Sequence, residues 1–315
     1  MRATKKTLTE HSLANLLVPN EHYNYFECRH EHPFRYQFNN FEMINAWWLV
    51  EAAFLAYAEP PFAEPRFQDA GLPNVKFFSG NSTQCYVAHN DDFIIVAFRG
   101  SEVRKRAGTN GRDIRYIVAD WWIDLNTDLV DSGRDGSVHS GFKEALKEVW
   151  DPQGRADEDK ALKPYLDTIS NTDGRRRSVW FTGHSLGGAL ATLAADQYGS
   201  GAELYTFGSP RVGDRTFADH FRVNAYRFVN NDDVVTKVPL PGSYRHVGQM
   251  KYIDSEGVIL DNPSLWVRLK ANFRRVVRNT FNLGLLRLRR VLPENALIDH
   301  APIYYAIHVW NNRVR

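Results

Sequence analysis

Residues 178–188 read SVWFTGHSLGG, and they give the clearest indication of the architecture. Val179, Trp180 and Phe181 form a short apolar run of residues that favour strands, whereas residues 189–198, ALATLAADQY, have the composition of a helix. Between them lies the pattern G-x-S-x-G, with Ser185 at its centre. A strand, this pattern and a helix in succession predict a nucleophile elbow, in which a sharp turn presents the serine hydroxyl.

The residue types in this turn suit a reaction that develops negative charge. The central residue of so tight a turn takes strained backbone angles, and glycines without a Cβ let the strand and the helix approach closely. The first turn of the helix supplies free N–H groups and the positive end of the helix dipole, which stabilise an oxyanion. The alternative is a glycine-rich turn that only connects a strand to a helix.

The composition is that of an ordinary globular protein, with 315 residues, of which 43% are hydrophobic and 24% are charged. The 39 basic and 37 acidic residues nearly cancel, so no net field indicates a nucleic-acid partner. This length suits one large α/β domain or two small ones, and we expect a single domain over residues 1–315. Nothing in the composition indicates an oligomeric state.

Cys28 and Cys85 are the only cysteines, and two free thiols are a simpler expectation than one disulfide. No Cys-x-x-Cys pair or histidine-rich spacing indicates a metal, and we expect no metal or organic cofactor. The first residues lack the apolar core of a signal peptide, and no apolar stretch has the length of a membrane span. These features predict a cytoplasmic protein, free or peripheral to a membrane, and leave signal-independent secretion open.

Segments typical of strands and helices alternate along the chain. Residues up to about 41 have no clear period and predict a capping segment on the core. We predict helices at 45–57, 140–150 and 160–170, and strands at 83–88, 93–98, 203–207, 224–229 and 245–253. Residues 93–98, FIIVAF, are continuously apolar, as in a strand buried on both faces. The alternation predicts an α/β fold with a mostly parallel central sheet flanked by helices.

Several motifs, taken in order, resemble the fungal-type lipase family, also called class 3 lipases, of the α/β-hydrolase fold. The matching motifs are FRGS at 98–101, DWWIDL at 120–125, VHSGF at 138–142, GHSLGG at 183–188, TFGSPRVGD at 206–214 and VNNDDVV at 229–235. The resemblance covers roughly residues 86–308. It implies hydrolysis of carboxylic esters, typically acylglycerols, by a Ser-His-Asp triad. A serine hydroxyl needs a base to accept its proton, and the base needs an acid to hold its tautomer, which agrees with that chemistry.

The acid of this triad is expected after the nucleophile and before the histidine. Asp232 and Asp233 both follow a predicted strand, and the carboxyl ends of strands are where such sheets present catalytic groups. The family pattern places an aspartate just before a β-branched pair, and Val234 and Val235 follow Asp233. The resemblance therefore implies Asp233, and Asp232 is expected to be a solvated loop carboxylate.

Five histidines are candidates for the base: His139, His184, His246, His300 and His308. The His184 ring is expected to point away from the proton of Ser185 and to serve in packing. His139 belongs to a strand-end motif and is also expected to be structural, whereas His246 falls within a predicted strand and His308 within a helix-like segment. His300 begins the last helix, with Asp299 as the expected N-cap and Pro302 in the first turn. The family's histidine also precedes such a helix, so the resemblance implies His300.

The family's oxyanion hole uses the backbone N–H after the nucleophile, which is Leu186 here, and a serine or threonine at the end of an earlier strand, which is Ser101. By resemblance, Asp124 orients the Ser101 hydroxyl; otherwise it is an ordinary helix carboxylate. The family also has a mobile lid helix between FRGS and DWWIDL. Here that stretch, from Glu102 to Val118, is longer and more basic than an amphipathic lid, so a lid and a solvated loop both stay open.

A second departure from the family is a basic segment, residues 264–290, which begins at Ser264 and ends at Arg290. It has no acidic residue, and apolar residues including Trp266 and Phe273 recur at helical spacing. A basic amphipathic helix of this kind is typical of a membrane surface or another anionic interface. The alternative is a helix docked on the core with its arginines exposed.

The sequence as a whole predicts a serine ester hydrolase, foremost a triacylglycerol lipase that acts on lipid at an interface. A phospholipase A1 and a short-chain esterase are alternatives within the same chemistry. A degenerate hydrolase that only binds lipid surfaces is the alternative outside it.

Overall fold

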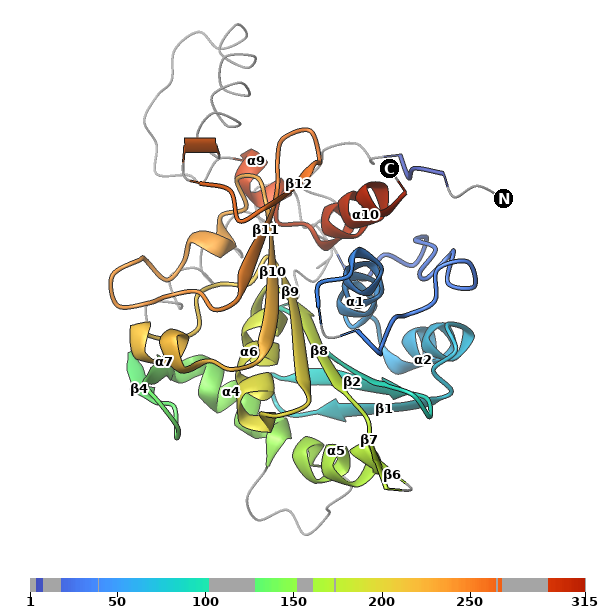
Figure 1. Cartoon of the computed structure of the whole chain (residues 1–315), viewed down its shortest axis with the longest axis horizontal. Coiled ribbons are helices and arrows are strands. Elements are labelled where there is room, and N and C mark those ends of the chain that lie inside the picture. The colour runs from blue at the N-terminus through green and yellow to red at the C-terminus, as the bar shows by residue number, and fades with distance from the viewer. Residues whose placement is uncertain are drawn as a thin grey trace, which may run out of the picture.

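The computed structural model describes residues 4–7, 18–38, 40–101, 128–151, 161–172, 174–264, 266–267 and 294–314. An eight-stranded sheet forms the centre of this part, with strand order β1-β2-β3-β8-β9-β10-β11-β12 (Figure 1). Its strands are β1 (Asn74–Ser79), β2 (Gln84–His89), β3 (Ile94–Phe98), β8 (Val179–His184), β9 (Ala202–Phe207), β10 (Asn224–Asn230), β11 (Gln249–Ile253) and β12 (Ile259–Asp261). From β3 to β11 neighbouring strands are parallel, and the two edges are antiparallel. The predicted α/β-hydrolase class, with a mostly parallel sheet, is confirmed.

Helices cover both faces of this sheet. They are α1 (Met43–Leu55), α2 (Pro60–Asp69), α4 (Ser140–Trp150), α5 (Leu162–Ser170), α6 (Leu186–Tyr198), α7 (Arg215–His220), the 3₁₀ turn η3 (Val235–Lys237), α9 (Glu294–Ile298) and α10 (Pro302–Arg313). Figure 1 shows α1 and α10 on one side of the central strands and α4 and α6 on the other. Two hairpins, β4 (Leu129–Asp131) with β5 (Ser137–His139) and β6 (Asn171–Thr172) with β7 (Arg175–Arg176), lie outside the sheet.

Most of the described core lies in two clusters, one on each face of the sheet, because side chains alternate between the faces of each strand. In β8, Trp180 joins the cluster of α1 and α10, whereas Val179 and Phe181 join the cluster of α4, α5 and α6. All five residues of β3 are buried, as the continuous apolar run predicts. The predicted strand at 245–253 is shorter than expected, since only Gln249–Ile253 pairs with β10. Gly248 has a φ of 73°, which ends the extended conformation there.

The residues before α1 pack on that helix through a buried carboxylate. Glu51 accepts hydrogen bonds from the Tyr23 hydroxyl at 2.7 Å, the Phe26 N–H at 3.1 Å and Trp47 Nε1 at 3.1 Å. Burial raises the pKa of Glu51, and these donors act in the opposite direction. The described part of the predicted capping segment is therefore fixed to the core. Cys28 and Cys85 are free thiols. Among the described helices, none combines the length and the apolar character that a membrane span requires.

Candidate active site

Ser185 lies in a sharp turn between β8 and α6. Its φ of 59° and ψ of −129° are strained values for a residue with a side chain. Glycines on both sides make the turn possible: a Cβ at Gly183 would lie 2.2 Å from the Gly187 carbonyl, and one at Gly187 would lie 2.2 Å from the Phe98 oxygen. The strand, turn and helix thus have the geometry that the motif predicts.

His300 lies against Ser185, although the two are 115 residues apart in the sequence. Its Nε2 is 2.9 Å from Ser185 Oγ, and its Nδ1 is 3.0 Å and 2.9 Å from the two carboxylate oxygens of Asp233. A carboxylate only accepts hydrogen bonds, so Nδ1 carries the proton and Nε2 is left to accept from the serine hydroxyl. All three side chains are buried. This arrangement can remove the proton from Ser185.

Asp233 is held at the carboxyl end of β10 and is completely buried, with 0% exposure. Its Oδ1 accepts from the Val235 N–H at 2.9 Å, and its Oδ2 accepts from the Tyr305 hydroxyl at 2.5 Å. Asp232 instead lies 3.3 Å from Lys237 Nζ and is partly exposed. Of the two candidate acids, the structure brings Asp233 to His300.

Tyr305 was not singled out from the sequence, because an aromatic residue in an apolar helix indicates only a core position. Burial, and secondarily the charge of Asp233, raises the pKa of Tyr305 well above its usual value, so the hydroxyl stays a donor. The same hydroxyl accepts from the Asn230 N–H at 3.0 Å. Tyr305 therefore ties the end of β10 and the carboxylate of Asp233 to α10.

The expected role of Asp299 as an N-cap is wrong. The N-cap of α10 is Ala301, with Pro302 in the first turn as predicted. Asp299 Oδ2 instead accepts from Asn231 Nδ2 at 3.0 Å and from the Asp232 N–H at 3.3 Å. These two donors lie in the loop after β10, so the Asp299 side chain is directed to that loop and not to the first turn of α10. Asp299 thereby joins the loop that carries Asp233 to the loop that carries His300.

The backbone segments of the two expected oxyanion donors adjoin each other. In the sheet, Phe98 of β3 pairs with Gly183 of β8, so the chain reaches Ser101 and Leu186 at the same edge. A Cβ at Gly100 would lie 2.6 Å from the His184 oxygen. Asp124 lies outside the described residues.

The remaining histidines are placed away from the proton of Ser185. His139 Nδ1 accepts from the Phe142 N–H at 3.3 Å and caps α4, and His246 Nε2 lies 2.8 Å from the Thr236 oxygen. His308 lies within α10. His184 does more than pack, since Nε2 is 2.7 Å from the carbonyl oxygen of His300 and Nδ1 is 2.8 Å from the Tyr57 hydroxyl.

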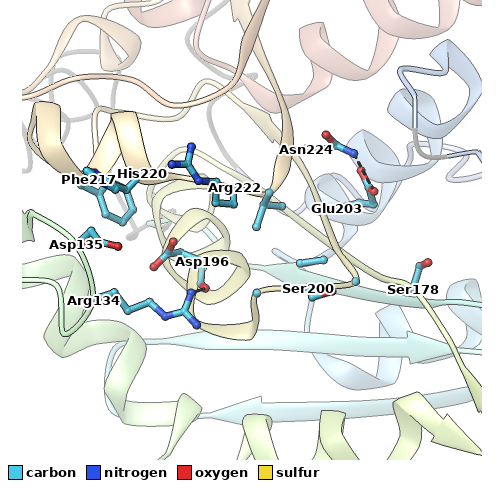
Figure 2. Close-up of a pocket in the computed structure, with 14 residues that line it drawn as sticks. Arg134, Asp135, Ser178, Asp196, Ser200, Glu203, Phe217, His220, Arg222 and Asn224 are labelled. Carbon is cyan, nitrogen blue, oxygen red and sulfur yellow. Dashed lines mark hydrogen bonds between the residues drawn. The ribbon is translucent and has the colours of Figure 1, made fainter.

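A cavity of about 680 Å³ lies at the amino ends of the central strands, at the opposite end of the sheet from Ser185 (Figure 2). Ser178, Ala202 and Asn224 line it, and they stand at or just before the amino ends of β8, β9 and β10. Ser185 and Asp233 follow the carboxyl ends of β8 and β10, so this cavity does not adjoin the cluster of Ser185, Asp233 and His300. Within the described residues, no group of three or more histidine, cysteine, aspartate or glutamate side chains is arranged to hold a metal ion.

The expected lid, from Glu102 to Val118, lies outside the described residues. Most of the basic segment 264–290 does so too. Its described apolar residues are exposed, with 80% of Trp266 and 45% of Val267 accessible to solvent.

Residues 95–242 match the family model described as lipase (class 3). Secreted mono- and diacylglycerol lipase 1 of Fusarium solani is 32% identical over 173 residues, which are 53% of this chain and 49% of the relative. Phospholipase A1-Igamma1, a chloroplastic protein of Arabidopsis thaliana, is 28% identical over 222 residues, covering 56% of this chain and 40% of the relative. A solved triacylglycerol lipase, described as having a serine protease triad at its catalytic centre, matches with a TM-score of 0.51 and 25% identity. That match covers 69% of this chain and 81% of the solved one.

The chain spans about half the length of the curated fungal relatives that it matches. The expectation of a cytoplasmic protein is contradicted by these relatives, because the similar lipases of Fusarium solani, Penicillium cyclopium and Penicillium camembertii are all named as secreted. That expectation used the composition of the first residues and the lack of an apolar stretch with the length of a membrane span. A leader is a removable segment that contributes nothing to the fold or the site on which the relationship rests.

The relationship thus rests on the ordered motifs within residues 95–242 and on an architecture shared with solved lipases. The comparisons place residues 95–242 of this chain with the fungal-type, class 3 lipases, and the fold around them is that of the α/β-hydrolases.

Proposed function

We propose that the protein hydrolyses carboxylic esters of lipids, foremost triacylglycerols, with Ser185, His300 and Asp233 as its catalytic residues. The observation that carries this proposal is the continuous hydrogen-bonded chain from Ser185 Oγ through His300 to the buried Asp233. Similarity to a solved triacylglycerol lipase and to a mono- and diacylglycerol lipase supports the substrate class.

Acylation begins when His300 Nε2 accepts the Ser185 proton as Oγ attacks the ester carbonyl. The imidazolium that forms is stabilised by Asp233, which keeps its own negative charge. His300 then gives the proton to the leaving alcohol, and the acyl group remains on Ser185. In deacylation, water loses a proton to His300 and attacks the acyl carbonyl; the bond to Ser185 Oγ then breaks, His300 returns the proton to Oγ, and the fatty acid is released.

The tetrahedral intermediates carry an oxyanion that needs fixed donors. We assign this role to the Leu186 N–H, at the start of α6, and to the N–H and hydroxyl of Ser101. The close approach of their backbone segments at Gly100 and Gly187 supports the assignment. Loss of one such donor typically lowers the rate about 10² to 10³-fold. Asp124 remains the proposed group that orients the Ser101 hydroxyl.

A phospholipase A1 activity is the second candidate. The similarity to Phospholipase A1-Igamma1 favours it, as do the basic residues of segment 264–290. We further propose that this segment contacts the lipid surface. The exposure of Trp266 supports that contact, because an exposed indole in a sequence rich in basic residues suits the boundary between water and lipid.

The test measures hydrolysis of nitrophenyl esters of increasing chain length, of triacylglycerol emulsions and of phosphatidylcholine vesicles. We compare the wild-type protein with Ser185→Ala and with Ser200→Ala, an exposed serine at the opposite edge of the sheet. Ser185→Ala is expected to lower kcat about 10³-fold or more, and Ser200→Ala is expected to leave it unchanged.

Undiminished hydrolysis by Ser185→Ala would contradict the mechanism. If the wild-type protein hydrolyses none of these esters but binds the vesicles, the non-catalytic binding module is correct instead. Faster release of fatty acid from phosphatidylcholine than from triacylglycerol would favour the phospholipase.

A further inference from the structure

Two buried hydrogen bonds link the Tyr57 hydroxyl, through the His184 ring, to the backbone of His300. The Tyr57 hydroxyl lies 2.8 Å from His184 Nδ1, and His184 Nε2 lies 2.7 Å from the His300 carbonyl oxygen. Tyr57, His184 and His300 are all buried. These hydrogen bonds connect Tyr57, two residues after the end of α1, to the loop that carries His300.

The direction of these bonds follows from the carbonyl group. A carbonyl oxygen only accepts, so His184 Nε2 carries a proton. Burial, and secondarily the neighbouring His300, lowers the pKa of His184 well below its usual value, so the ring is neutral. Nδ1 therefore has a lone pair and accepts from Tyr57, whose pKa burial raises. One tautomer of His184 satisfies both partners.

The surroundings of Tyr57 explain why its hydroxyl can reach this position. A Cβ at Gly100 would lie 2.1 Å from the Tyr57 hydroxyl oxygen, so the glycine before Ser101 makes room for it.

The His184 ring also lies close to two other rings: its centroid is 4.5 Å from that of His300 and 5.7 Å from that of Tyr305. A neutral His184 adds no repulsion when His300 becomes positively charged.

We propose that His184, with its tautomer fixed by Tyr57, is a positioning residue that holds the His300 backbone so that Nε2 stays aligned with Ser185 Oγ. The role rests on the proposed hydrolase function. It also gives α1 and the residues after it, which precede the matched residues 95–242, a part in the geometry of the site. A displacement of about 1 Å in such a site can lower the rate about 10²-fold.

The test uses His184→Phe, which keeps a ring without hydrogen bonds, and His184→Gln, whose amide can still donate to the carbonyl. With a soluble nitrophenyl ester, His184→Phe is expected to lower kcat about 10 to 100-fold with little change in KM, and His184→Gln to recover most of that loss. Tyr57→Phe is expected to lower kcat less, and to have no further effect in the His184→Phe background. Tyr86→Phe, which removes another buried hydroxyl bond, to the Ala58 oxygen at 2.7 Å, is the matched control.

A His184→Phe protein with wild-type kcat, or a His184→Gln protein no better than His184→Phe, overturns the positioning role if Ser185→Ala is inactive. An active Ser185→Ala protein overturns the hydrolase mechanism and the positioning role together. If His184→Phe does not fold, ¹⁵N NMR of the wild-type protein decides. The expected spectrum at pH 6 shows a neutral His184 ring protonated at Nε2, and a ring that is cationic or protonated at Nδ1 overturns the proposal.

Discussion

The substitution Tyr305→Phe removes one hydroxyl from the site and leaves the ring in place. The lost bond joins the hydroxyl to Asp233 Oδ2 at 2.5 Å, and its acceptor is a buried carboxylate. Hydrogen bonds to charged groups contribute about 1.5 to 3 kcal/mol. Asp233 keeps the Val235 N–H and His300 as donors, so the carboxylate remains but is held less firmly.

If all of that energy is lost in the transition state, kcat/KM falls about 10 to 100-fold, because about 1.4 kcal/mol corresponds to a factor of ten. The Asn230 N–H also loses its acceptor, so the melting temperature is expected to fall by a few degrees. Steady-state hydrolysis of a soluble ester and a thermal melt measure the two effects. Tyr86→Phe should reproduce the thermal effect without the kinetic one. A Tyr305→Phe protein with wild-type kcat/KM would refute the view that α10 fixes the acid.

Four further substitutions test other parts of the account. Asp299→Ala should lower kcat and the melting temperature, since Asp299 joins the loop of Asp233 to the loop of His300, whereas Asp232→Asn, which weakens a partly exposed ion pair with Lys237, should change stability by less than about 1 kcal/mol. Gly187→Ala should unfold the protein or abolish activity, because its Cβ would lie 2.2 Å from a backbone oxygen, and a stable, active variant would contradict the packing at the elbow. Burial raises the pKa of Glu203 to about 7, from 4.5, so the folded state holds its proton more tightly than the unfolded state. Its carboxyl thus stabilises the fold below about pH 4.5, and this contribution is lost as the pH rises through about 7. Thermal melts at pH 5 and pH 8 should show Glu203→Gln gaining stability over the wild-type protein at the higher pH, and an equal difference at both would be contrary to this.

The sequence predicts the parts of the site that depend on short local patterns. G-x-S-x-G fixes the turn at Ser185 because only glycine tolerates the close contacts there. The run of apolar residues indicates that β3 is buried. The alternation of strand-like and helix-like segments along the chain indicates a mostly parallel sheet. The choice of Asp233 over Asp232 needed the family pattern, since both follow the same strand.

The supporting groups could not be predicted in this way, because their roles arise from contacts between distant segments. Tyr305 lies 72 residues from Asp233 and acts on it only because α10 packs beside the end of β10. His184 reaches Tyr57 across 127 residues. The sequence suggests Asp299 as an N-cap, but α10 begins two residues too late for that role, and Asp299 accepts hydrogen bonds from the loop after β10.

Covalent labelling tests the central claim, that Ser185 is a nucleophile activated by His300. A long-chain alkyl fluorophosphonate is added, and the modified peptide is identified by mass spectrometry over time. We expect one phosphonyl group on Ser185 in the wild-type protein, none in Ser185→Ala, and labelling slowed about 10³-fold or more in His300→Ala. Labelling at another residue, or equal rates with and without His300, would contradict the account.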